Sequence, residues 1–111
     1  MRLDIKIGEE SHQFVVFNLC SQNGYSDYEG IPDRDLALDM TTVVNRVIAM
    51  EFRIECWNDL LCLAEDDCMY LTIYSSGRII LEKVPGYDPQ IALPYFMQVL
   101  AASVDKGGIP L

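Results

Sequence analysis

The spacing of apolar residues changes twice along the chain, and each change marks an expected structural element. Residues 3–7 alternate between apolar and polar, "GEES" forms a turn signal, and residues 12–20 are apolar on both sides at their centre. Alternation has the period of a β-strand, and a strand without a polar side is typical of a sheet interior. The pattern therefore predicts a hairpin whose second strand lies inside a sheet.

The next stretch, "SQNGYSDYEGIPD" at 21–33, is rich in Gly, Ser, Asn and Asp. We predict a loop there, the longest irregular segment of the chain. Long loops in compact domains often carry function.

Helical spacing follows the loop. Pro32 marks its start, and Asp33 and Asp35 supply the negative charge that a helix N-terminus favours. These features predict a helix over 34–50. The apolar positions at helical spacing are Leu36, Met40, Val43, Val44, Val47 and Ile48.

From residue 52 the period is two, and four antiparallel strands are expected in the order "FRIECW", "LLCLAE", "CMYLTIYS" and "RIILEKV". The segment "PGYDP" ends the alternation. A second helix carries Tyr95, Phe96, Val99 and Leu100 and ends at Gly107 and Gly108. Because proline is tolerated only in the first turn of a helix, this helix begins or kinks at Pro94.

The expected order β-β-α-β-β-β-β-α predicts a single α+β domain over 1–111. It contains one antiparallel sheet of about six strands, with two helices packed on one face. Strict alternation places Trp57 on the other face, together with Tyr70, Thr72 and Tyr74 of the third strand of the meander. We therefore expect an aromatic sheet face that no helix covers.

The segment "WNDLLCLAEDDCMYLTIYSSGR", residues 57–78, resembles one half-repeat of the TATA-box-binding protein family, and the order of elements is compatible over roughly 12–105. The motif that matches most closely is Ile73 to Arg78. The resemblance implies a TBP-like, saddle-shaped fold. It also implies that Trp57 and Tyr74 correspond to the aromatics that wedge between base steps, with Arg78 at the rim. Ser-Ser-Gly before a basic residue also suits any tight hairpin.

Two departures from that family weaken an inference of DNA binding. The family has two halves in one chain, so this chain would need a homodimer, and "LLCLAEDD" offers no basic residue. The 17 acidic residues against 8 basic ones give a net charge of −9, which repels phosphate and favours basic partners. We therefore do not expect nucleic-acid binding.

No catalytic, metal or cofactor signature emerges, and we expect a protein that is not an enzyme and has no cofactor. The only histidine, His12, is expected in solvent beside a turn. Four cysteines, Cys20, Cys56, Cys62 and Cys68, lack the short spacing of zinc sites, so we expect free thiols. No apolar run approaches the ~18 to 20 residues of a membrane span, and we expect a soluble, cytoplasmic protein without membrane contact.

The function expected from the sequence is that of a small acidic adaptor, inhibitor or immunity-type protein. It would offer the aromatic sheet face, or the 21–33 segment, to a basic protein partner. The binding residues expected are Trp57, Tyr70, Thr72, Tyr74 and Arg78. Two alternatives stay open: a nucleic-acid-binding module acting as a homodimer, and a small-ligand-binding domain.

Overall fold

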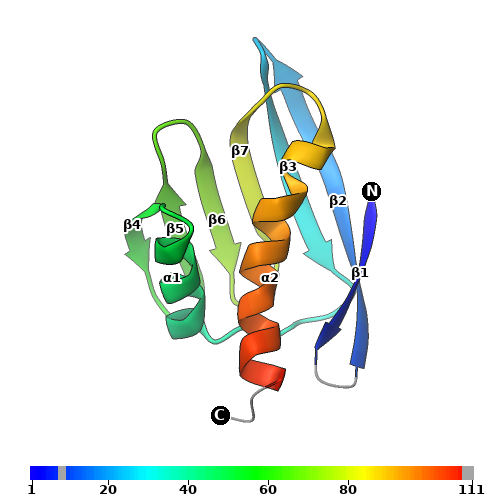
Figure 1. Ribbon diagram of the computed structural model, residues 1–111, viewed down its shortest axis with the longest axis vertical. Helices are drawn as coiled ribbons and strands as arrows, with labels where there is room; N and C mark the ends of the chain where they lie inside the picture. The colour runs from blue at the N-terminus through cyan, green and yellow to red at the C-terminus, as the bar shows by residue number, and fades with distance from the viewer. Residues whose placement is uncertain (8–9, 109–111) are drawn as a thin grey trace.

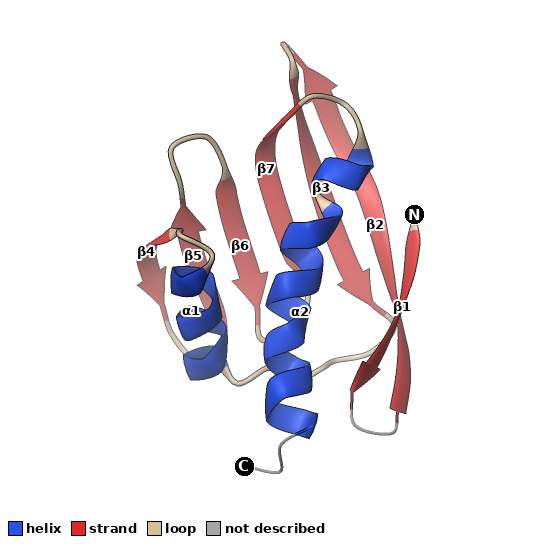
Figure 2. Ribbon diagram, in the orientation of Figure 1, coloured by secondary structure: helices blue, strands red, loops and turns tan. Residues whose placement is uncertain are grey.

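The computed structural model describes residues 1–7 and 10–108, which form one seven-stranded antiparallel sheet with two α-helices on one face (Figures 1 and 2). The α+β prediction is confirmed, with seven strands in place of about six. The order across the sheet is β1-β2-β3-β7-β6-β5-β4. The elements along the chain are β1 (Arg2–Ile7), β2 (Glu10–Gln22), β3 (Tyr25–Pro32), α1 (Met40–Ala49), β4 (Arg53–Trp57), β5 (Leu61–Glu65), β6 (Tyr70–Tyr74), β7 (Ile79–Pro85), the 3₁₀ turn η1 (Pro89–Ile91) and α2 (Leu93–Gly108).

The additional strand comes from the segment that the sequence analysis predicted to be a loop. Residues 21–33 instead continue β2, turn at Asn23 and Gly24, and return as β3. Both turn residues have positive φ, 55° and 83°. A two-residue hairpin turn of this kind matches the twist of its strands, and Asn-Gly is its strongest sequence signal. The loop prediction was wrong because turn-forming residues were taken to fill the segment, when only two of them make the turn.

The first helix is shorter than predicted, because it begins at Met40 and not at residue 34. Ala37 has a φ of 48°, which interrupts any helix there. On either side of it, the backbone N–H groups of Leu36 and Leu38 donate to the carbonyls of Ser76 and Ser75, at 2.9 and 2.7 Å. The segment before α1 therefore lies extended along the β6–β7 turn, and Asp33 and Asp35 are not at the helix N-terminus.

The hydrophobic core lies between the sheet and the two helices. α1 packs over β4 and β5, and α2 lies beside α1 (Figure 1). Phe14 on β2 meets Phe96 on α2 with ring centroids 5.8 Å apart. A glycine is required at residue 30, since a Cβ there would lie 2.3 Å from the Phe14 ring. Pro94 falls in the first turn of α2, as predicted.

A β-bulge in β4 overturns the predicted orientation of Trp57. Ile54 pairs with Ala64 but Cys56 pairs with Leu63, so Glu55 is an extra residue. Directly paired residues of an antiparallel sheet project to the same face. Trp57 pairs with the fully buried Cys62, and it therefore projects to the helix-covered face. Strict alternation fails here because an inserted residue reverses every later position in the strand.

Candidate functional site

The sheet face opposite the helices is covered by no described element, and we call it the open face. Its central row crosses six strands, and each member is paired with the next in register. The row consists of Phe17, Glu29, Ile80, Thr72, Leu63 and Cys56. Phe17 is 47% exposed, and most of the other apolar side chains of the row are half-buried. The face is thus a mixture of apolar, aromatic and charged groups.

Three of the five predicted binding residues, Tyr70, Thr72 and Tyr74, project together from β6 onto the open face, because their partners on β5 are Glu65, Leu63 and Leu61. The fourth, Arg78, begins the return from the β6–β7 turn.

The Arg78 guanidinium lies 5.1 Å from the ring centroid of Tyr74, and it forms an ion pair with Glu29 on β3. Arg78 thus joins the open face. The fifth predicted residue, Trp57, does not.

Tyr70 has charged neighbours on both sides and above its ring. It is paired with Glu65 on one side and with Glu82 on the other. The Lys83 ammonium lies 5.4 Å from the centroid of its ring. Neither glutamate forms an ion pair within the described residues. A cation over an aromatic ring is attracted by the negative face of the π system.

Bulges in two strands shape the sheet beside Tyr70. Leu19 is an extra residue in β2 and Lys83 in β7, and both bulges adjoin Asp27 and Tyr28 of β3. Lys83 has a φ of 60°, in the left-handed region that favours glycine. The Asp27 carboxylate accepts its backbone N–H at 2.9 Å. Bulges increase local twist and redirect side chains, and here they direct Lys83 over Tyr70.

A pocket of about 500 Å³ opens at this bent end of the open face. Its walls include Tyr25 and Asp27 from β3, Asp67 and Cys68 from the β5–β6 turn, and Tyr70 and Lys83. Only Tyr70 was among the predicted binding residues, although Tyr25 and Asp27 lie in the 21–33 segment that was expected as an alternative binding region. The pocket escaped prediction because its residues come together through the β2–β3 hairpin, which the sequence analysis took for a loop; the Asn-Gly pair was the available signal.

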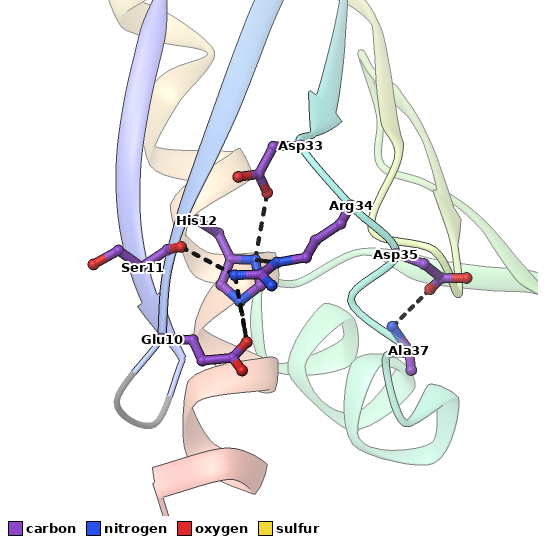
Figure 3. Close-up of polar contacts among 7 residues, drawn as sticks. All are labelled: Glu10, Ser11, His12, Asp33, Arg34, Asp35 and Ala37. Atoms are coloured by element: carbon purple, nitrogen blue, oxygen red, sulfur yellow. Dashed lines mark hydrogen bonds and ion pairs between the residues drawn. The ribbon is translucent and has the colours of Figure 1, made fainter.

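A second polar cluster surrounds His12, which is buried at 6% exposure and not in solvent as predicted (Figure 3). The Arg34 Nε donates to His12 Nδ1 at 3.1 Å. Carboxylate oxygens of Asp33 and Glu10 lie 3.4 and 3.6 Å from the two ring nitrogens. His12 lies on the same, helix-covered face of β2 as the buried Phe14 and Val16. The cluster joins the β1–β2 hairpin to the chain following β3.

The cluster also changes the acidity of one of its members. A backbone hydrogen bond from Gln13 holds the pKa of Asp33 below its ordinary value of 3.8, and His12 and Arg34 contribute in the same direction. Asp33 is exposed and at the edge of the cluster. The arrangement suits a structural junction, since its charged groups are satisfied by one another.

The four cysteines are free thiols, as predicted; Cys20, Cys56 and Cys68 are exposed and Cys62 is buried. Burial raises the pKa of the Cys62 thiol to about 11, with a smaller contribution from Cys56. In residues 1–7 and 10–108, no three His, Cys, Asp or Glu side chains converge in a way that could hold a metal ion. No helix of the described chain has the length and apolar character needed to cross a membrane.

Comparisons with known proteins give no match of any kind. No family model, no curated protein and no solved structure matches the chain. The open face and its pocket therefore have to be interpreted from their own geometry and charge.

Proposed function

We propose that this chain is a non-enzymatic protein-binding module whose open face receives a basic protein partner. The observation that carries the proposal is a seven-stranded sheet with both helices on one side (Figure 2). The other side carries half-buried apolar and aromatic side chains. Uncovered surfaces that combine apolar and aromatic groups in this way are typical of interfaces.

The dimensions of the face suit such a role. The molecule measures 44 × 28 × 19 Å, and the sheet extends across its two longer dimensions (Figure 1). A standard interface takes roughly 800 Å² from each partner. One face of this sheet has room for an interface of that size.

The charge of the molecule favours a basic partner over a second copy of the chain. The net charge is −9. On the open face, Arg78 is neutralised by Glu29 and Arg53 by Asp67. Glu65 and Glu82 are left without ion pairs among the described residues. Two copies facing each other would bring these carboxylates together, whereas a basic partner would neutralise them.

The test compares capture of a partner from the native host by the wild-type chain and by two pairs of variants. Phe17→Arg and Thr72→Arg place a cation on the open face. Ile48→Arg and Met97→Arg place a cation at exposed positions of α1 and α2, on the other side of the sheet. We expect the wild type to retain a basic protein, and the open-face variants to retain it at least ~10-fold less, because central interface residues commonly contribute 2 kcal/mol or more.

The helix variants serve as matched controls and should retain the same protein as the wild type. Equal retention by all four variants, loss confined to the helix variants, or the absence of any retained basic protein would each contradict the proposal. Circular dichroism of every variant establishes that the fold is unchanged.

A further inference from the structure

The pocket at the bent end of the open face has three properties that together limit what it binds. It is concave, with a volume of about 500 Å³. It exposes the ring of Tyr70, which already has a cation above it. It also lies in acidic surroundings: Asp27 and Asp67 line the pocket, and Glu65 and Glu82 are the cross-strand partners of Tyr70.

Lys83 shows that the Tyr70 ring in this pocket accepts a cation. Its ammonium has no carboxylate partner among the described residues and lies over the ring of Tyr70. The Lys83 backbone is in a left-handed conformation that lysine rarely adopts. Its N–H donates a hydrogen bond to the Asp27 carboxylate. The chain thus places a cation of its own on the aromatic wall of the pocket.

We propose that this pocket binds the cationic side chain of an arginine or lysine from the basic partner, and that Lys83 occupies the same ring position until the partner displaces it. The inference rests on the proposed function and specifies the chemistry of one anchor point. A guanidinium or ammonium group would gain the face of Tyr70 and the attraction of Glu65 and Glu82, which flank Tyr70 and have no ion pair among the described residues.

An anionic ligand is the competing interpretation, since Lys83 could serve as its counterion. It would have to approach Asp27 and Asp67 in the pocket wall, and the rest of a molecule with a net charge of −9. Repulsion from these groups opposes anion binding. Substitution of Lys83 separates the two interpretations, because they predict effects of opposite sign.

The experiment titrates the full chain with Nα-acetyl-arginine amide, followed by NMR chemical shifts. The comparison ligands are the equivalent derivatives of citrulline, a neutral isostere of arginine, and of glutamate. We expect saturable shifts of pocket residues with the arginine ligand and weaker binding of the other two. Lys83→Gln should raise affinity for the arginine ligand by about 2- to 5-fold, because one competing ring–cation contact is lost.

A second substitution tests the ring itself. Tyr70→Leu should lower affinity for the arginine ligand by about 2- to 5-fold. Trp57→Leu is the matched control, because the two aromatic residues are 43% and 44% exposed but project to opposite faces. It should leave the affinity unchanged. Both Lys83 and Tyr70 are exposed, so neither substitution removes a core side chain.

Several outcomes would overturn the inference. They are an absence of saturable binding, citrulline binding as tightly as arginine, tighter binding of the glutamate ligand, or a loss of arginine affinity in Lys83→Gln. The partner-capture assay then separates this failure from failure of the proposed function. If Tyr70→Leu still retains the partner while Thr72→Arg releases it, the open face is the interface and the pocket is not its cation anchor.

Discussion

Lys83 is one of four described non-glycine residues whose backbone has a positive φ. Lysine gains nothing from a φ of 60°, and residues in the left-handed region cost about 1 kcal/mol or more unless their surroundings hold them. Asp27 provides that hold by accepting the Lys83 N–H. The lysine side chain is directed over Tyr70 as a result, so the strained backbone serves the pocket and not the core.

Buried and exposed cysteines should differ sharply in reactivity. With its pKa raised to about 11, the Cys62 thiol is ionised to only about one part in a thousand at pH 8, and thiolate is the reactive form. We expect a chromogenic disulfide reagent to titrate three thiols in the folded chain and the fourth only after unfolding. Rapid titration of all four in the folded chain would show that Cys62 is accessible.

Tyr28 places a polar hydroxyl group in the hydrophobic core. It is fully buried, and its hydroxyl has no hydrogen-bond partner among the described residues. Removing an unsatisfied buried hydroxyl relieves a desolvation cost of about 1 to 3 kcal/mol. We therefore expect Tyr28→Phe to raise the free energy of unfolding by about 1 kcal/mol in urea titrations. A loss of stability of that size would mean that the hydroxyl is satisfied.

Asp33 should make stability depend on pH in the acid range. Its pKa is lower in the folded chain than the ordinary 3.8, so its charged form stabilises the fold. That contribution is present above the ordinary value and is lost as the pH falls through the folded value. Asp33→Asn should therefore be less stable than the wild type near neutrality, with a difference that shrinks below about pH 4.

Urea unfolding at several pH values from 2 to 6 measures this difference. A gap between wild type and Asp33→Asn that stays constant throughout would rule out the ionisation of Asp33 as its cause.

At the scale of elements, the predicted helix and the observed extended segment before α1 imply opposite effects of Ala37→Gly on the free energy of unfolding. In the helix predicted from the sequence, Ala37→Gly would lower the free energy of unfolding by about 1 kcal/mol. In the structure Ala37 has a φ of 48° and is exposed, and glycine adopts that conformation without the penalty of a Cβ. We expect Ala37→Gly to raise the unfolding free energy by up to about 1 kcal/mol.

The control for this experiment is Ala49→Gly, at the exposed alanine that ends α1. It should lower stability by up to ~1 kcal/mol. If Ala37→Gly destabilises the chain as Ala49→Gly does, residue 37 does not adopt the left-handed conformation in solution.

Element type was predictable from the sequence wherever a regular period continued. The direction of side chains was mispredicted in β4, where an extra residue interrupts that period. The meander β4–β7 and the placement of Tyr70, Thr72 and Tyr74 on one face follow from a period of two. Trp57 was placed on the wrong face because nothing in "FRIECW" announces an extra residue at Glu55. Bulges depend on the pairing partner, which a single strand's pattern does not contain.

The pocket was beyond prediction for a related reason. It requires the bulge at Lys83 and the β2–β3 hairpin together, and it joins Asp27 to Asp67, which lie forty residues apart in sequence on different hairpins. Tyr70 was identified because one strand determines its orientation. Its neighbours were not, since the register of several strands brings them together.

For the whole molecule, charge and the two-sided distribution of aromatic residues favour the proposed protein partner over a nucleic acid. The resemblance to the TATA-box-binding protein family implied that Trp57 and Tyr74 share one concave surface. The pairing of Trp57 with Cys62 and of Tyr74 with Leu61 places them on opposite faces. One groove of DNA cannot receive both rings from a single copy of the chain, and wedging between base steps needs the rings on the contacting face.

We therefore expect no measurable binding of duplex DNA near physiological salt. The net charge of −9 repels the phosphate backbone, and two of the open-face cations, Arg53 and Arg78, are already paired with acids. Basic proteins themselves bind non-specific DNA with dissociation constants of only about 10⁻⁴ to 10⁻⁶ M under such conditions. Fluorescence anisotropy with a labelled duplex at ~150 mM salt should stay flat as the protein is added. Saturable binding at micromolar concentration would reverse the choice of partner and return the open face to the nucleic-acid alternative, because phosphate contacts would then have overcome the repulsion of the whole molecule.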